Sequence, residues 1–107
     1  MPRPDQVAEL LIDVEAHLRQ LGLWQEQSPP EEAFESTQPF FIDTLSFDQW
    51  LQFVFLPTMY QLIEDNAAFP TECAIAPMAE EFFRGSALAS RGLEVTLAQV
   101  DRLLTQG

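Results

Sequence analysis

A strongly aromatic stretch, residues 36–63, constrains most what this chain can fold into. It reads STQPFFIDTLSFDQWLQFVFLPTMYQLI and contains no lysine, arginine, histidine or cysteine. Acid–base and nucleophilic chemistry usually needs at least one of those side chains, whereas packing needs aromatic ones. We therefore expect this stretch to form a structural core or a docking surface rather than an active site.

Length and composition predict a single folded domain, residues 1–107. Hydrophobic residues make up 47% of the chain, and a chain of this length can bury roughly two-thirds of its unfolded surface. Seventeen acidic and five basic residues give a net charge of −12. This charge repels nucleic-acid phosphate and anionic lipid, so direct binding to either is not expected, whereas a basic protein partner is attracted. A solvated acidic face that only keeps the protein soluble is the alternative.

The sequence contains no recognisable export or membrane signal. Its first residues, MPRPDQVAELL, carry acids and prolines where a secretion signal has an apolar run. The longest unbroken apolar run, Phe53–Leu56, is far too short to span a membrane. A single cysteine, Cys73, cannot form an internal disulfide. We expect a cytoplasmic protein that does not enter a membrane.

Apolar spacing predicts an all-α fold, a small bundle of about four main helices. The first helix covers about residues 5–21 and ends at Gly22, and its stripe is Val7, Leu10, Leu11, Val14, Leu18 and Leu21. A short helix capped by Ser28 is expected to end near Ser36. Another runs from Ile75 to Phe83, and a last helix carries a stripe of Leu93, Leu97, Val100 and Leu104.

The central helix is predicted to begin after Ser46 and to be kinked. Ser46 and Gln49 have the spacing of a capping box, in which each side chain satisfies the other residue's backbone. Pro57 removes a backbone donor inside the helix, so a kink or break is expected there. The polar sides before and after Pro57 point in different directions, which indicates a central element contacted on several sides.

Candidate chemical groups are few, and each has a simpler explanation. Asp13 and His17 lie four residues apart on the first helix, where an exposed ion pair explains them better than a catalytic or metal site. Asp43 and Asp48 flank the start of the central helix, where turns and caps use such residues. Cys73 has no nearby positive charge, and the neighbouring Glu72 raises its pKa, so a buried, unreactive thiol is expected. We predict no catalytic residue, no cofactor and no metal.

Aromatic side chains are the remaining candidate for function. We assign a protein-interaction site to Phe40, Phe41, Trp50 and Phe53, because the central helix is apolar on more sides than one neighbour covers. The alternative is that these rings belong to the core.

Four segments resemble the YqcC-like family of small proteins from gamma-proteobacteria. They are LGLW at Leu21–Trp24, STQPFFIDTL at Ser36–Leu45, WLQFVFLPTM at Trp50–Met59 and CAIAPMAEEF at Cys73–Phe82. The resemblance implies an all-helical bundle and no known activity, because the family is described as uncharacterised. It also implies a link to tRNA pseudouridine modification, since relatives are often encoded near a tRNA pseudouridine synthase. Thr58 departs from the basic residue expected there in relatives.

Three functional hypotheses follow. The first is a non-enzymatic interaction or accessory module that binds a basic RNA-modifying enzyme. The second is a small hydrolase or metal-dependent enzyme that uses Asp43, Asp48 or the Asp13–His17 pair. The third is a homodimer that pairs through its own aromatic surface.

Overall fold

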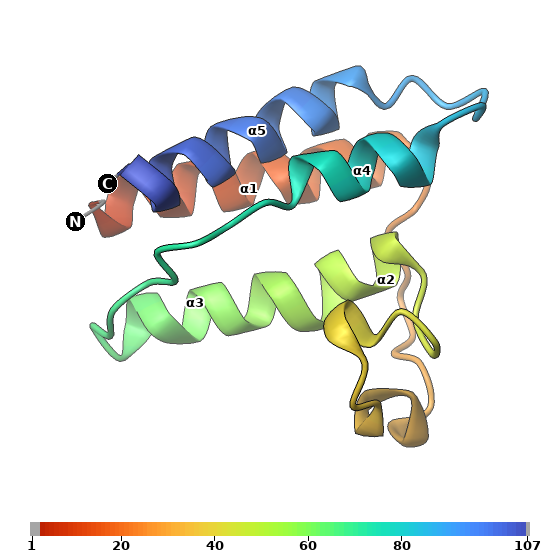
Figure 1. The fold of residues 1–107 in the computed structure, drawn as a ribbon, viewed down its shortest axis with the longest axis horizontal. Coiled ribbons are helices and arrows are strands. Elements are labelled where there is room, and N and C mark those ends of the chain that lie inside the picture. Colours follow the sequence, from red (N-terminus) through yellow and green to blue (C-terminus); the bar gives the residue numbers. More distant parts are fainter. Residues whose placement is uncertain (1–2, 107) are drawn as a thin grey trace.

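The computed structural model describes residues 3–106, and four main helices form a bundle in it (Figure 1). They are α1 (Pro4–Gln20), a central helix built of α2 (Phe47–Trp50), η3 (Leu51–Phe55) and α3 (Leu56–Glu64), then α4 (Ala76–Phe83) and α5 (Arg91–Gln106). Two short 3-10 segments, η1 (Glu31–Glu35) and η2 (Pro39–Phe41), lie in the connection before α2. Residues 3–106 contain no strand, so the predicted all-α bundle is confirmed.

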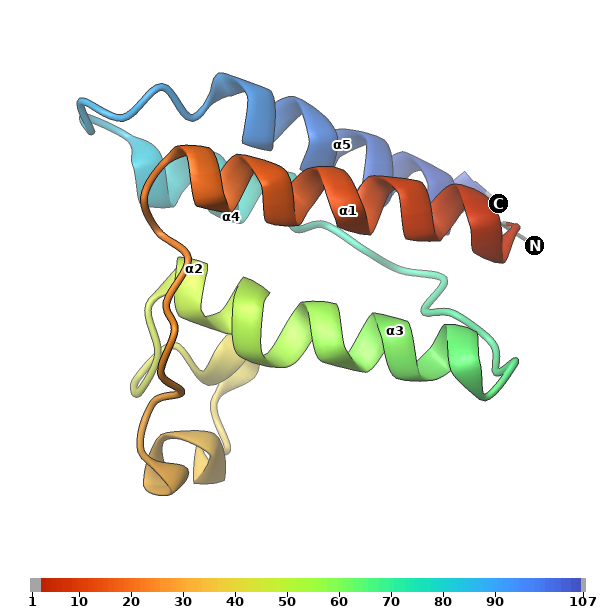
Figure 2. The same ribbon diagram turned by 180° about the vertical axis from the view of Figure 1, so that it is seen from behind.

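Helices α1 and α5 lie side by side and antiparallel, with the two chain termini at the same end (Figures 1 and 2). The predicted stripes form their contact, and the buried members are Val7, Leu11, Val14, Leu18, Leu93, Leu97, Val100 and Leu104. Gly22 adopts a φ of 74° just after α1, which is the left-handed conformation that glycine provides at helix ends. None of the helices in residues 3–106 has both the length and the hydropathy that crossing a bilayer requires.

Gly92 allows α1 and α5 to approach closely at one point. A Cβ atom added to Gly92 would lie 2.6 Å from Cε1 of the His17 ring. The half-buried imidazole therefore rests in the space that a side chain on α5 would occupy. This packing corrects the expectation of an exposed Asp13–His17 ion pair, because no such pair forms among residues 3–106.

The central helix begins at the predicted capping box. Gln49 Oε1 accepts a hydrogen bond from the Ser46 backbone N–H at 3.0 Å. The expected irregularity at Pro57 is a wide π turn, η3, immediately before the proline rather than a break. The Leu56 N–H donates to the Leu51 carbonyl, one residue further back than in an α-helix. The helix thus tolerates the missing proline donor and continues to Glu64.

Asp101 on α5 caps the start of α4. Its Oδ1 accepts a hydrogen bond from the Ile75 N–H at 2.8 Å, and its Oδ2 accepts one from the Ala76 N–H at 2.8 Å. The carboxylate satisfies two helix-end donors that have no partner within the helix, and its charge suits the positive end of α4. A side chain distant in sequence therefore fixes where α4 begins.

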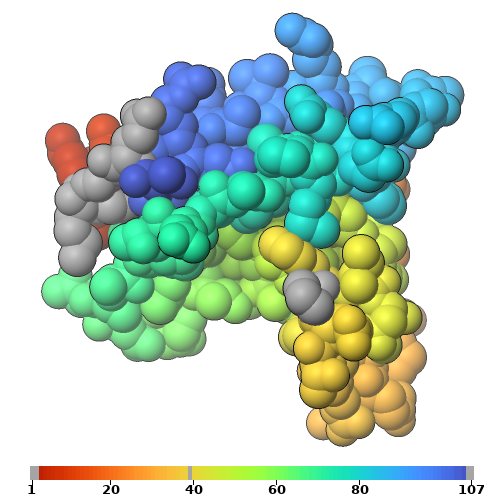
Figure 3. Space-filling model, viewed as in Figure 1, coloured from red at the N-terminus to blue at the C-terminus, as the bar shows by residue number. Residues whose placement is uncertain are grey.

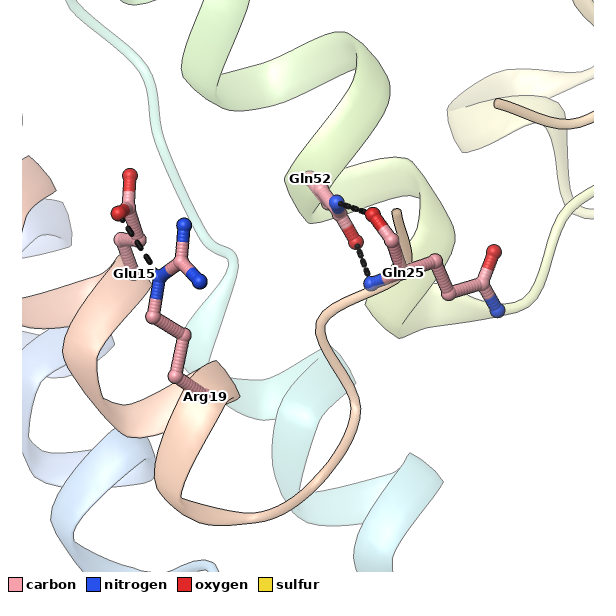
Figure 4. Close-up of polar contacts among 4 residues, drawn as sticks. All are labelled: Glu15, Arg19, Gln25 and Gln52. Atoms are coloured by element: carbon pink, nitrogen blue, oxygen red, sulfur yellow. Dashed lines mark hydrogen bonds and ion pairs between the residues drawn. The ribbon is translucent and has the colours of Figure 1, made fainter. Parts of the chain in front are cut away.

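Gln52 fixes the connection after α1 to the central helix (Figure 4). Its Oε1 accepts from the Gln25 N–H at 2.9 Å, and its Nε2 donates to the Gln25 carbonyl at 2.6 Å. Leu23 and Trp24 pack against the core, and the Arg19 guanidinium lies 4.6 Å from the Trp24 ring centroid. The predicted Ser28 cap is wrong: η1 starts at Glu31 without a side-chain cap, because Pro30 keeps the preceding chain extended.

Candidate functional site

A cluster of aromatic rings gathers where the loop before α2 meets the central helix and α4. Trp50 is at its centre, with ring-centroid distances of 4.8 Å to Phe40, 6.2 Å to Phe47 and 5.5 Å to Phe55. Phe47 in turn lies 5.7 Å from Phe82. The Phe40–Trp50 pair is edge-to-face, the arrangement that aromatic quadrupoles favour.

Two hollows open beside this cluster. One, the Met78 hollow, has a volume of about 330 Å³, and its walls are Phe40, Ile42, Leu45, Ser46, Phe47, Trp50, Met78, Glu81 and Phe82. The other, the Cys73 hollow, has a volume of about 250 Å³, and its walls are Phe40, Trp50, Val54, Phe55, Thr58, Met59, Pro70, Glu72, Cys73, Ala74, Ile75 and Leu104. Phe40 and Trp50 belong to both, so this pair forms the wall between them.

The Met78 hollow has an exposed apolar rim. Ile42 is 67% exposed, Phe82 is 41% exposed and Phe40 is 36% exposed. In the space-filling view the segment around residues 40–47 lies against α4 on this face (Figure 3). Adjacent exposed apolar side chains in a soluble fold mark contact sites more often than single ones do.

The backbone that carries Phe40 is strained. Phe40 and Phe41 have φ values of 58° and 53°, in the left-handed region that non-glycine residues rarely adopt. This conformation costs about 1–2 kcal/mol per residue. Nearby hydrogen bonds hold the loop: the Leu45 N–H donates to the Phe41 carbonyl at 2.8 Å, and the Thr44 hydroxyl donates to the Ala33 carbonyl at 2.6 Å.

The structure brings together only two of the four residues that the sequence assigned to a protein-interaction site. Phe40 and Trp50 share the wall between the hollows, whereas the half-buried Phe41 and Phe53 line neither hollow. Sequence reasoning missed Ile42, next to the assigned pair of phenylalanines. Its position beside them was the available signal, but only the fold shows that this isoleucine faces solvent.

The acidic side chains proposed for catalysis lie on different parts of the fold. The exposed Asp43 accepts a hydrogen bond from the Ser36 hydroxyl, and Asp48 is buried in the first turn of α2. Asp13 and His17 lie on α1, where the histidine packs against α5. Within residues 3–106, no group of three histidine, cysteine or acidic side chains is arranged to hold a metal ion.

Cys73 is held as a thiol. Burial first, and then the hydrogen bond from its Sγ to Asp101 Oδ1 at 3.0 Å, raise the pKa of Cys73 to about 12. The predicted rise in the pKa is confirmed, but burial and Asp101 on α5 cause it rather than the neighbouring Glu72. A thiol with this pKa is a poor nucleophile at neutral pH.

Known proteins resemble this chain over most of its length. An uncharacterised protein from Haemophilus influenzae is 44% identical over 72% of the chain and 73% of its own length. YqcC from Escherichia coli K12 is 39% identical over 75% of the chain and 73% of its own length. The solution NMR structure of E. coli YqcC superimposes with a TM-score of 0.83 and 34% sequence identity, over 98% of this chain and 90% of that one.

A further relative is much longer than this chain. A tRNA pseudouridine synthase C from Pectobacterium carotovorum is 47% identical over 65% of the chain, but the match spans only 19% of that protein. Residues 6–103 match the family described as "DUF446: tRNA pseudouridine synthase C". The chain therefore belongs to the DUF446 family, together with the small, uncharacterised YqcC-like proteins.

Proposed function

We propose that this chain is a non-catalytic accessory domain that binds a tRNA pseudouridine synthase through the surface around Phe40 and Trp50. The observation that carries the proposal is the pair of apolar hollows that these two rings separate. Large aromatic side chains such as Trp50, in partly enclosed apolar surfaces, supply most of the binding energy at protein interfaces. The exposed Ile42 and Phe82 beside them add apolar area that a partner would remove from water.

The charge of the chain supports a protein partner rather than tRNA itself. A net charge of −12 opposes the approach of a phosphate backbone and favours the approach of a basic protein surface. Enzymes that act on tRNA need basic surface to hold their substrate, so they offer the complementary charge. The acidic domain is thus suited to contact the enzyme and not its nucleic acid.

The Pectobacterium relative supports the identity of the partner. In that protein a segment similar to this chain occupies 19% of a polypeptide named tRNA pseudouridine synthase C. Two parts of one polypeptide are held at high effective concentration, so even a weak contact between them is populated. A domain of this kind that is not covalently joined to the enzyme must supply that contact through its own surface, and the Phe40–Trp50 surface is suited to do so.

The test is binding to a purified tRNA pseudouridine synthase C that lacks a segment of this kind. Ile42→Ser removes a side chain that is 67% exposed on the rim of the Met78 hollow, and Ile12→Ser removes one that is 60% exposed on α1. We expect isothermal titration calorimetry to show that the wild type binds and that its affinity falls as the salt concentration rises. Relative to the wild type, the affinity should fall by about tenfold or more in Ile42→Ser and by no more than about twofold in Ile12→Ser.

Trp50→Ala provides the second variant. Binding should be lost while circular dichroism still shows a cooperative thermal transition; unfolding would instead show that Trp50 serves the core. Absence of any complex, or equal effects of the two isoleucine substitutions, contradicts the proposal. Sedimentation of the chain alone at two concentrations tests self-association, and a dimer that buries Ile42 would replace the synthase as the occupant of this surface.

A further inference from the structure

We infer that Phe40 is a displaceable plug, and that the two hollows join into one groove for a synthase segment with a bulky apolar side chain flanked by basic residues. This inference rests on the proposed function and specifies how the same surface works. Its first support is topological: among the residues that line the two hollows, Phe40 and Trp50 alone are shared by both. Moving the Phe40 ring aside removes one of the two residues that form the wall between them.

The conformation of Phe40 stores backbone strain that a movement of the loop would release. Both Phe40 and Phe41 adopt left-handed φ values, of 58° and 53°, and the Phe40 side chain is 36% exposed. Its edge-to-face contact with Trp50, at 4.8 Å, offsets this strain. A partner side chain that packs on Trp50 provides the same contact and lets the loop relax, so the relief of strain offsets part of the free energy that displacement requires.

The hollows are large enough to receive apolar side chains of a partner segment. Sites for drug-sized ligands have volumes of about 300–1,000 Å³, and these hollows, at about 330 and 250 Å³, lie at or below the lower end of that range. Each is therefore suited to one or two apolar side chains of a partner segment. The wall lining is almost entirely apolar, so a bulky hydrophobic anchor fits better than a polar group.

The charged residues at the hollows indicate the flanking residues of the occupant. Glu81 lines the Met78 hollow and Glu72 lines the Cys73 hollow, and both are exposed. Glu81 also pairs with the exposed Arg84 at 3.0 Å, an exchangeable surface contact. A segment that lies across both hollows passes one carboxylate on each side of Trp50. Arginine or lysine on both sides of its apolar anchor complements this arrangement.

Phe40→Gly tests the plug, because glycine removes the ring and relieves the left-handed strain. If the groove is open in about a tenth of the molecules, the variant binds the synthase about tenfold more tightly than the wild type. Weaker or unchanged binding by Phe40→Gly overturns the plug while leaving the docking surface in place. Absence of binding by the wild type removes both the proposed function and this inference. Thermal unfolding by circular dichroism confirms that the variant is folded.

Glu72→Gln and Glu81→Gln test the basic flanks, with Glu9→Gln on the exposed side of α1 as the matched control. Each groove variant should bind about threefold or more weakly and show a shallower salt dependence than the wild type. Effects no larger than those of Glu9→Gln contradict the basic flanks. The two sets of variants therefore test the anchor and the flanks of the occupant independently.

Discussion

Replacing Asp101 with alanine should strongly destabilise the domain, because this one carboxylate ties the start of α4 to α5. The carboxylate accepts backbone hydrogen bonds from Ile75 and Ala76, both at 2.8 Å, and one from the Cys73 thiol at 3.0 Å. Losing a side-chain cap costs about 0.5–2 kcal/mol, and a hydrogen bond to a charged group contributes about 1.5–3 kcal/mol. Because Asp101 serves two backbone donors at once, we expect a loss of about 2–4 kcal/mol in the free energy of unfolding.

Urea denaturation followed by circular dichroism measures this loss, since the unfolding free energy depends linearly on urea concentration. Asp101→Asn retains one acceptor oxygen but not the charge, so it should lose about half as much. Asp13→Ala, on the exposed side of α1, is the control and should change stability by less than about 0.5 kcal/mol. A loss in Asp101→Ala as small as that of the control would refute the view that this contact fixes the start of α4.

Three further predictions concern contacts that hold the fold. Gln52→Ala should cost about 1–2 kcal/mol and speed hydrogen exchange at the Gln25 amide; unchanged exchange would contradict the role of this contact. Gly92→Ala should destabilise the wild-type chain because the added Cβ lies 2.6 Å from His17, whereas in a His17→Ala background it should stabilise the fold by up to about 1 kcal/mol through helix propensity. Equal effects in the two backgrounds of this double-mutant cycle would refute the packing of His17 against Gly92. Stability should fall as the pH rises from about 9 to about 12, because burial and Asp101 raise the pKa of Cys73 from 9.0 to about 12 and the folded state therefore holds the thiol proton more tightly. Urea titrations across this pH range should show a shallower fall in Cys73→Ser, and an identical slope would contradict the raised pKa of Cys73.

Helix positions were predictable from the sequence because they depend on local features. The apolar stripes of α1 and α5, the capping box at Ser46 and the glycine after α1 act over a few residues. Pro57 also indicated an irregularity in the central helix. The chain forms a π turn just before the proline, and the helix continues beyond it. Local sequence thus defined the elements and the family to which they belong.

The contacts between elements were not predictable in the same way, because they join residues far apart in the chain. Asp101 reaches 25 residues back to Ala76, and Gln52 reaches 27 residues back to Gln25. Nothing in the sequence around either residue distinguishes it from an ordinary solvent-exposed polar residue. The same reasoning explains His17, whose expected surface pair with Asp13 is replaced by packing against Gly92.

The candidate site was likewise predictable only in part from the sequence. Composition alone indicated an aromatic surface within residues 36–63 and an acidic chain suited to a basic partner. Tertiary structure decided which rings reach it: Phe40 and Trp50 meet between two hollows, Phe41 and Phe53 do not line them, and Ile42 joins the rim. Periodicity tells which side of a helix is apolar, but exposure depends on how much of that side the neighbouring helices cover, and only their packing sets that.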